Sequence, residues 1–235
     1  MNPFIRMAWL CWLWSLISFI AMGYARAESL AKSEQGIAAD IRALSCIAAK
    51  LGEVILRTDP HPGLRAWAVA SLVKDAYGVR AFEAEQLELL DPEAAKSKRA
   101  EAIRTLRLAK EAGWAHLKGI ALDTTASASD ELALAYWTAA AWGALIALDR
   151  DDFDALADWP KAKALADWVR RQQADFGEGA ALMLAASFEF SSPGGDKAQA
   201  KRWFADVLHR YGANQAMLHV LLAEQIGRAS CRERV

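Results

Sequence analysis

Residues 37–224 are rich in strong helix-forming residues, chiefly Ala, Leu, Glu, Lys, Gln and Arg, and no stretch alternates β-branched and polar residues. Helix-breaking Pro, Gly and Asn residues fall mainly between the periodic segments, where helices are expected to end. This pattern predicts an all-α fold of antiparallel helical hairpins with short connections.

Apolar residues recur at helical spacing in a series of segments, and we expect helices at residues 37–56, 64–90, 92–122, 131–148, 153–174 (a shorter pair), 175–190, 196–210 and from 215 onward. Asp91 is expected to cap the third of these, with Pro92 at its first position. Asp175 with Glu178, and Asp196 with Gln199, have the spacing of a capping box.

Residues 132–148 contain no charged residue. A helix that is apolar on all sides is either fully buried or in a membrane. The segment is Ala-rich, is short for a membrane span of about 20 residues, and has acidic residues on both sides. We therefore expect it to be the central core helix.

The first 27 residues have the features of a secretory signal peptide. Arg6 precedes an uncharged apolar stretch over residues 7–22, and Ala25-Arg26-Ala27 matches a signal-peptidase site. The mature chain is then predicted to begin at Glu28, after export. A retained membrane anchor is the alternative, and Cys11 lacks the small preceding residue that a lipidation site needs, so no lipid anchor is expected.

The last ten residues, 226–235, read IGRASCRERV. A common sequencing adapter, translated in one frame, gives this peptide followed by a stop codon. We therefore expect residues 226–235 to be foreign to the protein, against the alternative of a natural basic tail. The predicted domain then covers residues 28–225, and its natural C-terminus is expected to lie further on.

The composition excludes several classes of protein. The formal net charge is −1, and five of the 28 Lys and Arg but one of the 29 Asp and Glu lie in the two ends. The predicted domain is therefore mildly acidic, and no nucleic-acid partner is expected. Cys46 is its one cysteine, so an internal disulfide is excluded, and its apolar surroundings predict a buried, inert thiol.

The sequence offers no catalytic constellation. The four His are scattered, and no metal-binding or phosphate-binding motif is present. Asp149, Asp151, Asp152 and Asp154 imitate the spacing of a calcium loop but lack its Gly and Glu, so helix capping is the preferred interpretation. We expect no enzymatic activity, no metal and no cofactor.

Seven Trp lie in the predicted domain, one or two per helix, where core packing is the simplest explanation. Tyr136, Trp137 and Trp142 are the candidates for a different role. Their positions on one helix spread the three rings around its axis. At least one of them is therefore predicted to border a groove for an apolar ligand or a partner chain.

The stretch 136–147 (YWTAAAWGALIA) is similar to the signature of the TRAP-transporter T component (TatT-like) family, as are residues 157–165, 179–184 and 193–204. Upstream, residues 99–109 fit the third helix of that family, and the likeness covers roughly residues 37–224. A degenerate tetratricopeptide-like array agrees with this resemblance, since Ala200 and Phe204 match one fragment of that repeat.

The resemblance implies a periplasmic accessory protein of a tripartite ATP-independent periplasmic (TRAP) transporter, not an enzyme. Its partner would be the substrate-binding P component, and a hydrophobic small ligand and a homo-oligomer are further candidates. The alternative function is a general periplasmic tetratricopeptide-like scaffold for protein–protein interaction.

Overall fold

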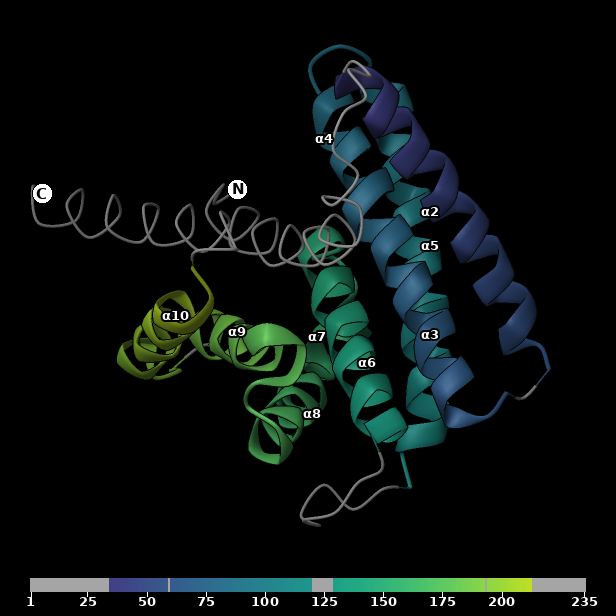
Figure 1. The fold of residues 1–235 in the computed structure, drawn as a ribbon. Helices are drawn as coiled ribbons and strands as arrows, with labels where there is room; N and C mark the ends of the chain where they lie inside the picture. Colours follow the sequence, from purple (N-terminus) through teal and green to yellow (C-terminus); the bar gives the residue numbers. More distant parts are fainter. Residues whose placement is uncertain (1–33, 59, 120–128, 193, 213–235) are drawn as a thin grey trace, which may run out of the picture.

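The computed structural model describes residues 34–58, 60–119, 129–192 and 194–212, and every regular element within these ranges is helical (Figure 1). The elements are α2 Glu34–Leu56, α3 Pro62–Val73, the π-helix η1 Lys74–Ala81, α4 Phe82–Leu87, α5 Pro92–Leu117, α6 Ser129–Leu148, α7 Phe153–Ala157, α8 Trp159–Gln172, α9 Phe176–Ser191 and α10 Lys197–Tyr211. The all-α prediction is therefore confirmed. The predicted signal peptide, the helix from residue 215 and the segment 226–235 lie outside the described residues.

Helix α6 forms the centre of the fold. It packs against α3 and α5 on one side and against α8 on the other. Among the described residues, α6 is long and apolar enough to cross a membrane, but 72% of its apolar window is buried inside the protein. It is therefore a core helix, as its uncharged sequence predicts.

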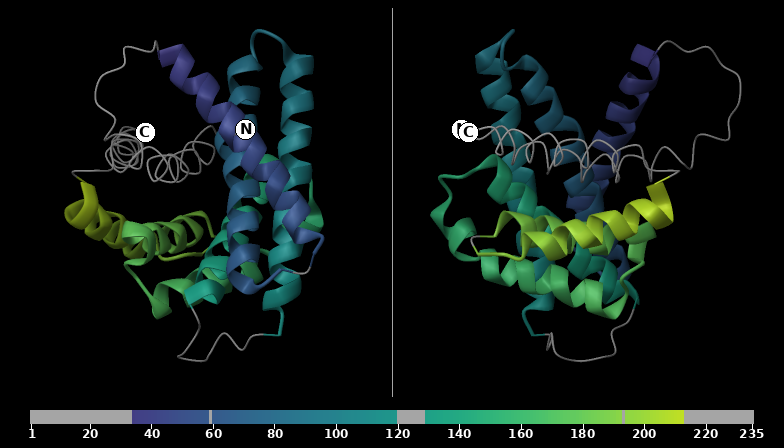
Figure 2. Two further views of the ribbon diagram at one scale, coloured as in Figure 1. Left: turned by 45° about the vertical axis from the view of Figure 1, so that its right-hand side comes forward. Right: turned by 90° about the vertical axis from the view of Figure 1, so that its left-hand side faces the viewer.

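The other helices form two groups around α6 (Figure 1, Figure 2). On one side, α3, η1 and α4 make a continuous rod that lies beside α5, and α2 packs on the outside of α3 and η1. On the other side, α8, α9 and α10 pack one after the next. Neighbours in sequence are thus neighbours in space, as expected of helical hairpins.

Helices α5 and α6 approach closely at Gly113, where a Cβ atom would overlap the hydroxyl of Thr138. That hydroxyl donates a hydrogen bond to the Leu134 carbonyl at 2.7 Å and is fully buried. The missing side chain at position 113 therefore sets the spacing of the two helices.

Short polar side chains begin several helices. The carboxylates of Asp91, Asp152 and Asp196 each accept a backbone N–H three residues further on, at 3.0, 2.9 and 2.8 Å. The predicted caps at Asp91 and Asp196 are confirmed, because each side chain satisfies an N–H that the helix leaves free. The capping box at Asp196 is only half formed, since the Asp196 N–H donates to Glu189 and not to Gln199.

The predicted capping box at the start of α9 is wrong. The side chain of Asp175 makes no cap hydrogen bond. Gly177, Glu178 and Gly179 have positive φ angles of 60°, 55° and 87°. This left-handed stretch separates Asp175 from the helix, so local spacing alone does not place the first turn.

Two other predictions need correction. The segment 64–90 is not one α-helix, because it changes to π-helix at Lys74 and back at Phe82. Cys46 is exposed, not buried. It lies on α2, whose buried side is formed by Ala49 and Gly52, so the apolar residues around Cys46 are not all directed inward.

Candidate functional site

The three aromatic residues predicted to form a groove differ in their exposure. Tyr136 and Trp142 are buried, with 2% and 1% of their surface exposed, whereas Trp137 is half-buried. All three lie on α6, and the spread of their rings around the helix follows from their spacing.

Trp142 faces α5. Its ring meets that of Trp114 edge to face, with 5.3 Å between ring centroids and 67° between ring planes. The ammonium of Lys110, also on α5, lies 5.5 Å from the Trp142 ring centroid. Such aromatic pairs stabilise a core beyond their burial alone, so the position of Trp142 is that of a packing residue.

Tyr136 and Trp137 form a separate contact. Their ring centroids lie 5.2 Å apart, and the ring centroid of Phe176, at the start of α9, lies 5.1 Å from that of Tyr136. The structure thus brings two of the three predicted residues together and places Trp142 elsewhere. Phe176 is a member of this group that sequence reasoning missed, because it is distant along the chain.

A lysine of the rod lies over the ring of Trp137. The ammonium of Lys74, the first residue of η1, lies 4.9 Å from the Trp137 ring centroid. Burial lowers the pKa of Lys74, because a charged amine loses hydration there. The contact is a cation–π interaction at the partly exposed edge of the aromatic group.

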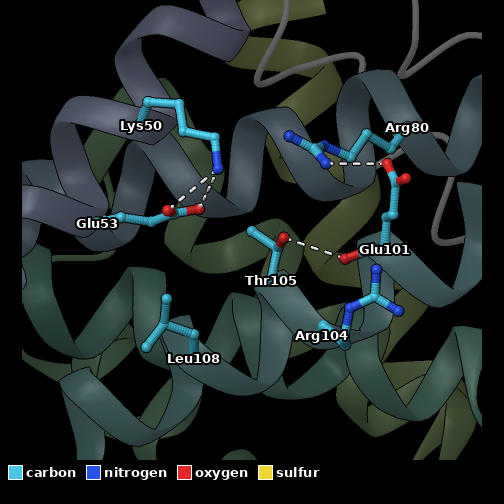
Figure 3. Close-up of a pocket in the computed structure, with 7 residues that line it drawn as sticks. All are labelled: Lys50, Glu53, Arg80, Glu101, Arg104, Thr105 and Leu108. Carbon is cyan, nitrogen blue, oxygen red and sulfur yellow. Dashed lines mark hydrogen bonds and ion pairs between the residues drawn. The ribbon is translucent and has the colours of Figure 1, made fainter.

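A cavity of about 400 Å³ lies on the other side of the rod, between α2 and α5 (Figure 3). Charged side chains dominate its lining, which consists of Lys50, Glu53, Arg80, Glu101, Arg104, Thr105 and Leu108. None of the three predicted aromatic residues lines this cavity.

The charges in this cavity are largely paired with one another. The Nε of Arg80 lies 2.6 Å from a carboxylate oxygen of Asp75, and its Nη1 lies 3.1 Å from Glu101. Burial lowers the pKa of Arg80, but its hydrogen bond to Asp75 and the charges of Asp75 and Glu101 outweigh this effect and raise the pKa above its ordinary value. The pair with Glu101 ties the rod to α5, and the pair with Asp75 lies within η1.

The π-helix explains why Arg80 reaches Asp75. In an α-helix, residues five apart point about 140° away from each other. In a π-helix, residue i+5 bonds to residue i through the backbone, so the two lie on one face. A reading at α-helical periodicity therefore gives no sign of this pair.

Two of the four aspartates that imitate a calcium loop, Asp149 and Asp152, have structural roles. Arg107 binds Asp149 at 2.8 Å and Asp152 at 3.0 Å. The backbone N–H of Ala155, and then the guanidinium of Arg107, lower the pKa of Asp152. Helix capping and an ion pair thus explain the position of Asp152.

The chain matches a known protein family over most of its length. A family model described as TRAP transporter T-component matches residues 41–233. The match includes the rod, α5, and α6 with its aromatic residues. It also extends into the segment 226–235. No curated protein matches the chain.

Proposed function

Because the chain belongs to the TRAP transporter T-component family, we propose that it acts in the periplasm as a non-enzymatic partner of the substrate-binding P component. Membership of the family makes it an accessory component of a TRAP transporter. The family match over most of the chain is the observation that carries the proposal. Binding of the P component, and of a ligand, are the parts that experiment must test.

The half-buried group around Trp137 supports a contact site for an apolar ligand or a partner segment. Trp137 offers an aromatic surface, Tyr136 and Phe176 hold the group from the protein side, and Lys74 adds a cation at its edge. Tryptophan gains much from burial on binding, and this position leaves part of its ring accessible.

The test is direct binding between the exported chain and the P component encoded nearest to it in the genome. Both proteins are purified, and their association is measured by isothermal titration calorimetry and size-exclusion chromatography. A saturable complex of defined stoichiometry is the expected result.

A chain that does not bind the P component but captures several unrelated envelope proteins would instead be a general scaffold. Titrating the same protein with an unrelated periplasmic binding protein provides the control for non-specific association.

A further inference from the structure

The outward face of α2 carries a row of exposed apolar side chains, which we call the α2 stripe. The exposed fractions of Leu44, Ile47, Leu51 and Val54 are 53%, 65%, 51% and 55%. Isolated exposed apolar residues are ordinary on protein surfaces, but a continuous row of them is typical of an interaction site.

The α2 stripe lies opposite the face by which α2 is attached. Ala49 is 1% exposed, and Gly52 is so close to α3 that a Cβ there would lie 3.0 Å from the Ala68 carbonyl oxygen. Helix α2 packs on α3 and η1 and otherwise forms the outside of the molecule (Figure 1, Figure 2). It therefore has two apolar faces, and within the described part of the chain one of them packs against other helices.

The stripe residues are spaced three, four and three positions apart. This is the spacing of the apolar seam in a coiled coil, where a second helix lies along the first. Two more exposed apolar side chains extend the surface onto α3, Leu64 at 51% and Trp67 at 43%.

The position of Trp67 follows from its neighbours. Arg65 lies two residues before it and donates to the Ala112 carbonyl on α5 at 3.5 Å. Trp67 is about 200° further around the helix and so faces away from α5. Since Ala68 touches α2, Trp67 lies beside α2 on the side away from the charged cavity. The surface thus has a tryptophan next to an aliphatic row, a combination common at binding hot spots.

The opposite border of the α2 stripe is basic. Lys50 and Arg57 are seven residues apart, so they project from the same side of the helix. Both are exposed. Lys50 pairs with Glu53 on its own helix at 3.2 Å, a surface interaction that a partner's carboxylate could replace at little cost.

On these observations we propose that the α2 stripe, with Leu64 and Trp67, docks an amphipathic helix of the P component. The helix would have an apolar seam flanked by Asp or Glu facing Lys50 and Arg57. This inference rests on the proposed function, since it names the surface through which the P component is bound.

Two other helices could lie on the α2 stripe: one from a second copy of this chain, or the helix predicted from residue 215. Charge favours a helix of the P component over both. A second copy paired antiparallel would set Leu44 against Val54 and Ile47 against Leu51, but it would also bring Lys50 opposite its own counterpart. The helix predicted from residue 215 of this chain brings a single carboxylate, Glu224, to the basic border.

The experiment compares binding of the P component to the wild-type chain and to the double variant Ile47→Glu, Leu51→Glu. Both positions are more than half exposed, so the variant is expected to keep its helical circular-dichroism spectrum and melting temperature. We expect its Kd for the P component to rise at least tenfold. The matched control, Leu89→Glu with Leu90→Glu, adds the same charge at two leucines exposed by 94% and 83%, and its Kd should change less than twofold.

A second measurement does not depend on the folding of any stripe variant. An environment-sensitive fluorophore on the exposed Cys46, in a chain with Cys231→Ser, should shift its emission when the P component is added. Lys50→Glu with Arg57→Glu should slow association and reduce its dependence on salt.

The outcomes separate this proposal from the proposed function. If the P component binds wild-type protein and the stripe variant equally well, the α2 stripe is not the docking surface and the function stands. If the variant instead breaks a dimer of this chain while still binding the P component, the occupant is a second copy and the proposal is overturned. If wild-type protein does not bind the P component at all, the proposed function fails as well.

Discussion

At the scale of single residues, the guanidinium of Arg80 compensates a carboxylate that is almost completely removed from solvent, since Asp75 is 2% exposed. Replacing Arg80 by Ala leaves this buried charge without its main partner. We expect Arg80→Ala to lower the free energy of unfolding by about 3–5 kcal/mol, measured by urea denaturation.

The control for this prediction is Arg104→Ala, which removes another arginine from the same cavity but an exposed one. Its effect should be within about 0.5 kcal/mol. Equal effects of the two variants would show that the pair with Asp75 does not support the fold.

A second prediction for single residues concerns the aromatic side chains of α6. Because Trp142 is buried against Trp114, Trp142→Ala should cost about 3–5 kcal/mol, and Tyr136→Ala should also be strongly destabilising. Trp137→Ala should cost less than about 2 kcal/mol, because part of that side chain is already exposed, and should weaken binding of an apolar ligand.

Thermal melting and binding titrations on the three variants provide the measurement. If all three variants lose stability to a similar large extent and none affects binding selectively, the groove hypothesis fails and these residues serve the core alone.

At the scale of helices, the contact between α5 and α6 depends on Gly113. A methyl group there meets the buried Thr138, so Gly113→Ala should destabilise the protein by about 1–2 kcal/mol, after the gain in helix propensity is subtracted. Gly119→Ala is the matched control, because a Cβ at that position has no atom within 4 Å.

Unfolding curves for both variants test this, together with the double variant Gly113→Ala, Thr138→Ala. The second change makes room for the added methyl group, so it should recover part of the loss. A Gly113→Ala variant as stable as the wild type would show that the helices can separate freely.

The joints between α8, α9 and α10 are expected to weaken in acid. Glu189 accepts hydrogen bonds from Lys163 on α8 and from the N–H of Asp196 at the start of α10, both at 2.7 Å. The Lys163 hydrogen bond, and then that of Asp196, lower the pKa of Glu189. Folding thus favours the ionised carboxylate, whose stabilising effect is present above the ordinary pKa and is lost as pH falls through the lowered one.

Urea denaturation between about pH 6 and pH 3 measures this effect. As pH is lowered, the free energy of unfolding of the wild type should fall more steeply than that of Glu189→Gln, which has no carboxylate at position 189 to protonate. Identical slopes for the two proteins would contradict the prediction.

Local sequence rules predict the helices of this fold better than the details within them. The uncharged α6 and the caps at Asp91 and Asp196 follow from patterns within a few residues. The π-helix at Lys74–Ala81 and the left-handed start of α9 do not, because a reading at α-helical spacing assumes regular α-helical angles throughout.

The candidate site shows the same division. Periodicity predicts that the rings of α6 spread around its axis, but it does not say which ring is buried, since that depends on the neighbours of α6. Helical periodicity also does not show which apolar face of α2 packs against the protein. It therefore predicts a buried Cys46, although the thiol is exposed.

At the scale of the whole molecule, the processing of the chain is the remaining expectation from the sequence. The Ala25-Arg26-Ala27 site predicts that the exported protein begins at Glu28. Mass spectrometry of the protein recovered from the periplasm should give an N-terminal peptide that starts there. A mature form that retains Trp9 to Trp14 would point to a membrane anchor instead.

The π-helix has a consequence for how the chain can change in length. Because a π turn holds an additional residue, η1 acts as a one-residue insertion within the rod from Pro62 to Leu87. Removing one residue between Asp75 and Arg80 would let the rod run on as an α-helix, with α4 still in its place beside α5. The two charges would then be four residues apart, a spacing at which an acid and a base pair well on an α-helix. A relative that aligns with a one-residue gap here would therefore have the same ion pair and the same packing, built on a straight α-helix.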